Sequence, residues 1–105
     1  MIISTTDTVD GMKIKKVLGI VEGNTIRARS VGRDILASFK NLVGGEIEEY
    51  TKLMAEAREQ AIDRMVEDAE KRGANAIVCM RFATTEIMKN AAEILAYGTA
   101  VIVDE

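Results

Sequence analysis

Three arginines and a serine, close together in the chain, are the residues best suited to bind an anion: Arg27, Arg29, Ser30 and Arg33. They lie just before, or at the start of, a predicted short helix, where free backbone N–H groups and the helix dipole attract negative charge. A phosphate, a nucleotide or a carboxylate could bind here, as the ligand of a binding protein or as the substrate of an enzyme. Alternatively, Arg33 and Asp34 form salt bridges and Ser30 caps the helix, because structural ion pairs use the same residue types.

Cys79 is the single cysteine of the chain and the one candidate ligand for a soft metal. Small domains usually hold such an ion with two thiolates from one C-x-x-C loop, but this chain has neither a second cysteine nor a histidine. A site would need several copies of Cys79, gathered by an oligomer. The alternative is a buried cysteine that packs as a small apolar side chain. We therefore predict no metal site within one chain, and no cofactor.

The composition excludes several classes of function. Without histidine, catalysis by an imidazole base is impossible, and no other residues are arranged as a nucleophile with its base, so a non-enzymatic protein is expected. Lys13, Lys15 and Lys16 have no interleaved aromatic residues, and the net charge is −3, which argues against nucleic acid as a partner. No apolar run approaches the ~18 residues of a membrane span. A lone cysteine suits a reducing compartment, and we expect a cytoplasmic protein.

The elements that position these residues follow from apolar periodicity and from glycines. The strongest signal is a helix over residues 46–72, with acidic residues at its start and Lys71-Arg72-Gly73 at its end. With 105 residues, the chain forms one domain, 1–105. The other expected elements are a strand over 12–22, a hairpin return over 25–29 across Gly23-Asn24, a short helix containing 35–43, and a strand hairpin of 76–87 and 93–103.

These elements predict an α+β, two-layer subunit, in which an antiparallel sheet of about three strands is covered by the short helix and the long helix. The helix over 46–72 would be ~40 Å long, whereas a globule of about 100 residues is roughly 33 Å across. Its apolar residues cover an arc of roughly 220°, far more than the ~100° stripe of a surface helix. The helix would therefore need a partner beyond its own sheet.

The strand over 93–103 is apolar on both faces, which is normal only where both faces are covered. The sequence therefore predicts self-association as a homo-oligomer. A monomer in which the short helix covers the second face of the sheet is the alternative. The candidate interface residues are Tyr50, Met54, Ala61, Met65, Tyr97 and Val101.

A series of motifs runs in order along nearly the whole chain: Gly23-Asn24, Arg29-Ser30-Val31-Gly32-Arg33-Asp34-Ile35, Asn41-Leu42-Val43-Gly44-Gly45, Tyr50, Glu56-Ala57-Arg58, Gly73-Ala74-Asn75-Ala76-Ile77 and Ala96-Tyr97-Gly98-Thr99-Ala100-Val101. Together they resemble the YbjQ family of small, mostly bacterial and archaeal proteins, described as uncharacterised or as candidate heavy-metal-binding proteins. The resemblance implies a dodecin-like subunit and a ring-shaped homo-oligomer, a pentamer. It implies no established activity, and this sequence lacks the ligands that the metal-binding description requires.

The leading hypothesis is therefore a cytoplasmic, non-enzymatic ring that acts in interaction or in small-ligand binding. A heavy-metal-binding protein that uses Cys79 from several copies is one alternative. An enzyme or a binder for an anionic small molecule near Arg29 and Arg33 is the other.

Overall fold

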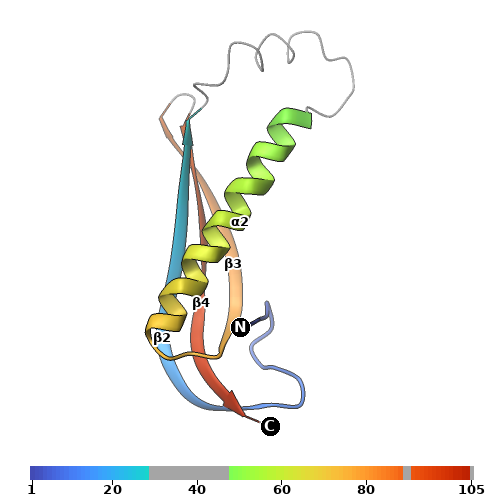
Figure 1. Ribbon diagram of the computed structural model, residues 1–105, viewed down its shortest axis with the longest axis vertical. Helices are drawn as coiled ribbons and strands as arrows, with labels where there is room; N and C mark the ends of the chain where they lie inside the picture. The colour runs from blue at the N-terminus through green and yellow to red at the C-terminus, as the bar shows by residue number, and fades with distance from the viewer. Residues whose placement is uncertain (29–47, 89–90, 105) are drawn as a thin grey trace.

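A computed structural model describes residues 1–28, 48–88 and 91–104 of the chain (Figure 1). The short helix expected around 35–43 lies outside the described residues, as do Arg29, Ser30 and Arg33. The described part contains one α-helix and four β-strands, in the order β1 (Ile2–Ile3), β2 (Lys13–Ala28), α2 (Glu48–Lys71), β3 (Ala76–Met88) and β4 (Ala91–Asp104).

The four strands form one sheet in the order β1-β3-β4-β2. β2 and β3 each pair antiparallel with β4, whereas β1 pairs parallel with β3. The α+β class is thus confirmed, but the sheet is mixed and has a fourth strand, which corrects the expected antiparallel sheet of about three strands. At two residues, β1 is too short for an alternation of apolar and polar residues to reveal it.

β2 is one continuous strand of 16 residues, so the hairpin return expected at Gly23-Asn24 is wrong. The whole strand pairs with β4 in one direction, from Lys13 opposite Asp104 to Ala28 opposite Ala91. Gly23 is required by packing, because a Cβ there would stand 2.3 Å from the Ala61 carbonyl oxygen and from the Met65 nitrogen of α2. The glycine that indicated a turn therefore marks a close contact between strand and helix.

β3 and β4 form the antiparallel hairpin that the sequence predicts, from Ala76 opposite Val101 to Met88 opposite Ala91. A bulge between Val78 and Arg81 interrupts the pairing. Cys79 lies in this bulge with a φ of 56°, in the left-handed region that few non-glycine residues adopt.

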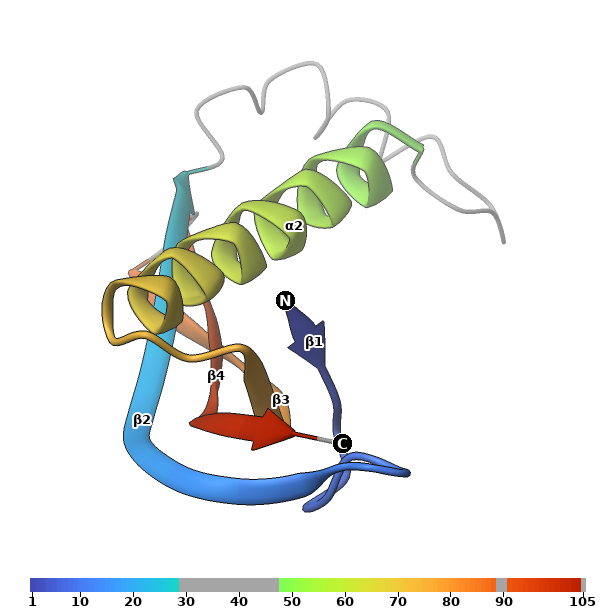
Figure 2. The ribbon, with the colours of Figure 1, turned by 60° about the horizontal axis from the view of Figure 1, so that its bottom comes forward.

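α2 confirms the helix predicted over 46–72 and lies across one face of the sheet, on β2 and β4 (Figures 1 and 2). Small side chains let the helix approach the strands closely. The buried residues of this layer include Ala57, Ala61, Met65 and Ala69 of α2 with Val21, Ile94, Ala96 and Ala100 of the sheet. Among the described residues, no helix has both the length and the apolar character of a membrane span.

The sheet, and not the helix, determines the length of the described subunit. The three long strands have 13 to 16 residues and reach about 43 to 53 Å, whereas the 24 residues of α2 reach about 36 Å. The expectation that the long helix extends beyond its own subunit, which assumed a spherical domain, is therefore wrong for this elongated sheet. The apolar faces of the strands remain as the argument for self-association.

The second face of the sheet is covered in part by the N-terminal segment, residues 4–12, which passes beside β3 (Figure 2). The Cys79 N–H donates to the Thr6 carbonyl oxygen at 2.9 Å, which fixes this segment along the bulge of β3. Val9 and Met12 of the segment then pack against a second buried cluster, formed by Ala76, Val78, Val101 and Val103.

Candidate self-association surface

Apolar side chains of β2 point to the face of the sheet that α2 does not cover. Val21 is fully buried against α2, so the alternation of the strand places Ile20 and Ile26 on the opposite face. Val17 lies opposite Val101, which belongs to the cluster beneath the N-terminal segment. Directly opposed residues share a face of the sheet. All three β2 residues therefore point away from the helix.

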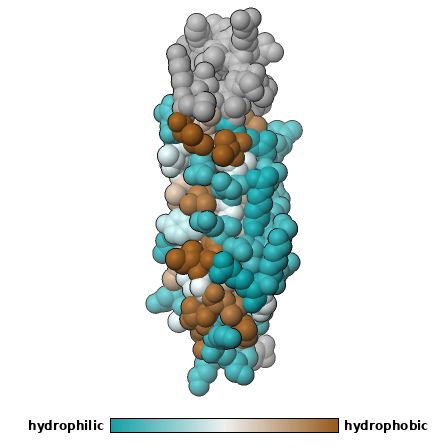
Figure 3. All heavy atoms as spheres, turned by 90° about the vertical axis from the view of Figure 1, so that its left-hand side faces the viewer, coloured by the Kyte–Doolittle hydropathy of each residue, from teal (hydrophilic) through white to brown (hydrophobic). Residues whose placement is uncertain are grey.

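Tyr97 of β4 lies on the same face, and the four residues Val17, Ile20, Ile26 and Tyr97 are termed the open sheet face below. Their exposed fractions are 61%, 70%, 58% and 37%. Diagonal neighbours on adjacent strands are about 7–8 Å apart, so Ile20 lies beside Tyr97, and half-buried Leu95 connects Tyr97 with Ile26. Seen from the β2 side, separate apolar patches recur along the described part of the molecule (Figure 3). Exposed apolar side chains gathered on one face are typical of contact sites.

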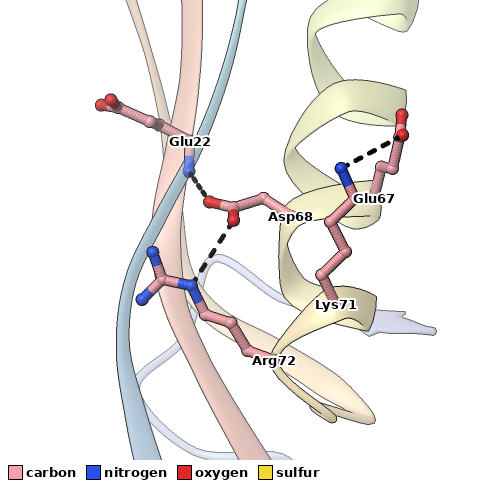
Figure 4. Close-up of polar contacts among 5 residues, drawn as sticks. All are labelled: Glu22, Glu67, Asp68, Lys71 and Arg72. Carbon is pink, nitrogen blue, oxygen red and sulfur yellow. Dashed lines mark hydrogen bonds and ion pairs between the residues drawn. The ribbon is translucent and has the colours of Figure 1, made fainter.

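The outer edge of β2 is partly occupied by side chains of α2. The Asp68 carboxylate accepts the Glu22 N–H at 3.4 Å and the Arg72 Nε–H at 3.5 Å, as Figure 4 shows. One turn earlier, Arg64 Nη1 donates to the Asn24 carbonyl oxygen at 2.5 Å. A strand added at this edge would need these same backbone groups. At the middle of β2, contact between copies is therefore favoured through the sheet face and not through the strand edge.

The six predicted interface residues lie in different surroundings. Three are buried within the chain: Ala61, Met65 and Val101. Met54 is half-buried against the core between α2 and the sheet, and Tyr97 belongs to the open sheet face. Tyr50 is part of the first turn of α2. As contacts between copies, all six stay predictions.

Sequence reasoning did not select Val17, Ile20 or Ile26. The turn expected at Gly23-Asn24 divided β2 into two short strands. The sequence alone did not assign the side chains of either strand to a face of the sheet. A signal was present, because residues 14–21 are apolar at both odd and even positions, as in the last strand. An apolar strand without alternation predicts cover on both faces.

Arg27 is the described member of the predicted anion-binding group. Its Nη2 donates to Gln60 Oε1 of α2 at 3.1 Å. Its Nε is buried without a hydrogen-bond partner, and the same is true of Thr25 Oγ1 on the same face of β2. The ion pairs found among the described residues do not include Arg27. The structure therefore brings Arg27, Thr25 and Gln60 together, while the other three predicted residues lie outside its described part.

Cys79 is half-buried and packs beside the cluster beneath the N-terminal segment. Within residues 1–28, 48–88 and 91–104, no group of three histidine, cysteine, aspartate or glutamate side chains comes together as a metal site requires. A soft metal would therefore need donors beyond those that the described part of one chain offers. The surroundings of the thiol agree with the packing role considered from the sequence.

Comparison with known proteins finds a family that matches nearly the whole chain. The YbjQ_1 family model, described as "Putative heavy-metal-binding", matches residues 1–104. A UPF0145 protein of Dehalococcoides mccartyi strain BAV1 is 58% identical over 104 residues, which cover 99% of this chain and 100% of the relative. A UPF0145 protein of Clostridioides difficile strain 630 is 58% identical over 105 residues, 100% of this chain and 94% of the relative.

A solved structure has the same fold. It is the crystal structure of a protein of unknown function from Pediococcus pentosaceus, of the DUF74 family. It superposes with a TM-score of 0.65 at 18% identity and covers 99% of this chain and 98% of the other. At that identity the likeness supports the arrangement of helix and strands, and the role of each residue is argued from this chain alone.

Proposed function

Because this chain belongs to the YbjQ family, we propose that it is a non-enzymatic subunit of a cytoplasmic homo-oligomer that acts in interaction or in small-ligand binding. The observation that carries the proposal is the open sheet face, with three β2 side chains exposed by more than half. The ring form, its dodecin-like subunit and its five members come from the family resemblance alone.

The physical support is the free energy available from covering this face. Full burial of a valine or isoleucine side chain contributes about 1.5–3 kcal/mol relative to exposure. Val17, Ile20 and Ile26, covered together with Tyr97, offer a gain comparable to the lower estimates of the cost of association. A closed ring of n copies has n such contacts, whereas an open chain has n − 1, so closure adds one contact to the stability of the assembly.

Light scattering and sedimentation of the purified protein test this proposal. We expect an oligomer at micromolar concentration, and Ile20→Asp should shift it towards monomer, because a carboxylate in an apolar contact loses its hydration. The matched control is Ala55→Asp, which changes an exposed residue of α2 in the same way. A clean monomer for the unmodified chain, or equal behaviour of the two variants, would contradict the proposal.

Soft-metal binding is a second candidate, favoured by the description of the family. It requires thiolates of Cys79 from several copies, since the described residues of one chain hold no group of ligands. The test is the metal content of the purified oligomer before and after Cys79→Ser. Metal that is lost on substitution supports this candidate, whereas no bound metal, or unchanged content, excludes it.

Binding of an anionic small molecule, with or without catalysis, is the third candidate, favoured by the unpartnered Nε of Arg27. A bound carboxylate or phosphate would offer this guanidinium the partner that it lacks. In a thermal-shift screen of nucleotides and sugar phosphates, a stabilising ligand should lose its effect in Arg27→Gln and keep it in the exposed control Arg58→Gln. If no compound of the screen shifts the melting temperature, this candidate is wrong.

A further inference from the structure

A charged row crosses the open sheet face at the height of Tyr97. Glu22 of β2 and Arg81 of β3 stand directly opposite Tyr97, one on each side. Opposed residues of adjacent strands share a face, so an acid, an aromatic ring and a base follow one another across the sheet. The Glu22 side chain points away from Asp68 and α2, as Figure 4 shows.

Neither charge finds a counter-charge among the described residues. The ion pairs found there are Lys15–Asp104, Lys71–Glu67 and Arg72–Asp68. Both Glu22 and Arg81 are exposed. Two strand spacings, about 10 Å, separate their backbones, and Tyr97 stands between them. The Arg81 Nη1 group donates to the carbonyl oxygens of Thr5 and Met80, each at 2.8 Å, which leaves Nη2 and Nε available.

We propose that, between two copies of this chain, the Glu22 carboxylate of one copy pairs with the Arg81 guanidinium of the next, beside Tyr97. The inference rests on the proposed function, because it needs a second copy. Rotation about an axis along the strands keeps each residue at the same height in every copy. Glu22 and Arg81 share one height at opposite sides of the sheet, so the β2 side of one copy meets the β3 side of the next with opposite charges.

The same charges disfavour the competing arrangement. About a two-fold axis along the strands, two copies joined β2 side to β2 side would bring Glu22 against Glu22, and like charges at a contact weaken binding strongly. Asp68 and Arg64 already occupy part of the β2 edge, which leaves the side chains of the open face to make the contact. The ion pair therefore determines the direction of assembly, while the apolar residues beside it supply most of the affinity.

Charge reversal with rescue tests this pair. Glu22→Arg and Arg81→Glu are compared singly and together in the full chain, by light scattering and sedimentation over a dilution series. Each single variant should raise the concentration of half-dissociation by at least about tenfold, and the double variant should return it to near the unmodified value. The control is Glu67→Arg, which reverses a charge on the exposed face of α2 and should leave the assembly unchanged.

Salt gives a second measurement on the same samples. Near 1 M salt the Debye length falls to about 3 Å, so the difference between the single variants and the unmodified chain should shrink. If a reversed variant fails to fold by circular dichroism, Glu22→Gln and Arg81→Gln replace it, and each should weaken assembly and reduce its dependence on salt.

The outcomes separate this inference from the proposed function. An unmodified chain that assembles, with inert single variants or with a double variant as weak as the singles, overturns the Glu22–Arg81 pair and leaves the oligomer intact. A monomeric unmodified chain overturns the proposed function itself, and the pair with it. Weakening by each single variant and recovery in the double variant supports both.

Discussion

At the scale of single residues, the α2-facing side of β2 carries polar atoms that burial leaves without partners. Thr25 is 3% exposed, and neither its Oγ1 nor Arg27 Nε makes a hydrogen bond. An unsatisfied buried polar group costs about 1–3 kcal/mol. Positions where a fold accepts such a cost are often those where a ligand is bound, which is why Arg27 remains a candidate while its neighbours in the sequence lie outside the described part.

Thr25→Val removes the unpartnered hydroxyl and keeps the β-branched shape of the side chain. The free energy of unfolding should rise by about 1 kcal/mol, which corresponds to roughly 4–8 °C in melting temperature for a domain of this size. Urea and thermal denaturation measure it. The control Thr85→Val, at an exposed position of β3, should change stability by less than about 0.5 kcal/mol. A clear loss of stability in Thr25→Val would show that the hydroxyl has a partner in solution.

Cys79 illustrates a backbone requirement that is independent of its thiol. Its φ of 56° lies in the left-handed region, where a side chain costs roughly 1–2 kcal/mol and glycine costs nothing. Cys79→Gly should therefore be more stable than Cys79→Ala by about 1 kcal/mol, although both lack the sulfur. At Ala83, in regular pairing with Leu95, Ala83→Gly should destabilise by about 0.5–1 kcal/mol. If Cys79→Ala is instead more stable than Cys79→Gly, as expected at Ala83, this residue has ordinary strand geometry.

At the scale of elements, the sequence predicted the helix and the hairpin, which are determined by interactions between residues close together in the chain. Charge at both ends of α2 and the absence of glycine within it indicated the long helix, and β-branched runs indicated the β3–β4 hairpin. The parallel pairing of β1 with β3 joins residues over 70 positions apart, and no periodicity records such a pairing. The cover that Val9 and Met12 give to the second face is equally remote in sequence, so the open part of that face could be located only with the structure.

Gly23 is the residue for which a local rule gave the wrong element. Gly23→Ala would place a Cβ 2.3 Å from backbone atoms of Ala61 and Met65. Because backbone atoms cannot rotate aside as a side chain can, this clash is relieved only if α2 moves away from β2. We expect a loss of at least about 2 kcal/mol in the free energy of unfolding, as for an overpacked core. Asn24→Ala adds no atom at the next position and should cost under about 1 kcal/mol. If the two variants unfold alike in urea, the close contact between strand and helix does not exist.

At the scale of the whole molecule, the two sheet faces are covered in different ways. α2 covers one face along β2 and β4, the N-terminal segment covers the β1 end of the other, and the remainder carries the open sheet face with its row of Glu22, Tyr97 and Arg81. Polar side chains of α2 occupy the adjoining strand edge. In the proposed assembly, the open sheet face supplies the apolar contact and the charged row orients it. The α2 side chains at the middle of the β2 edge disfavour open-ended addition of strands there.

Mixing the two single variants, Glu22→Arg and Arg81→Glu, tests the direction of assembly and whether the ring has an even or an odd number of subunits. In a head-to-tail ring, a chain with Glu22→Arg fits a neighbour with Arg81→Glu on either side, but it repels its own kind. When the two kinds of chain alternate around the ring, every contact joins opposite charges only if the number of subunits is even. Native mass spectrometry of the 1:1 mixture should therefore show mixed, even-numbered species or open chains, whereas the double variant should form the same oligomer as the unmodified protein. In a pentamer, two chains of one kind must meet at least once, so pentamers that form as readily from the mixture as from the double variant would rule out a head-to-tail contact through this pair.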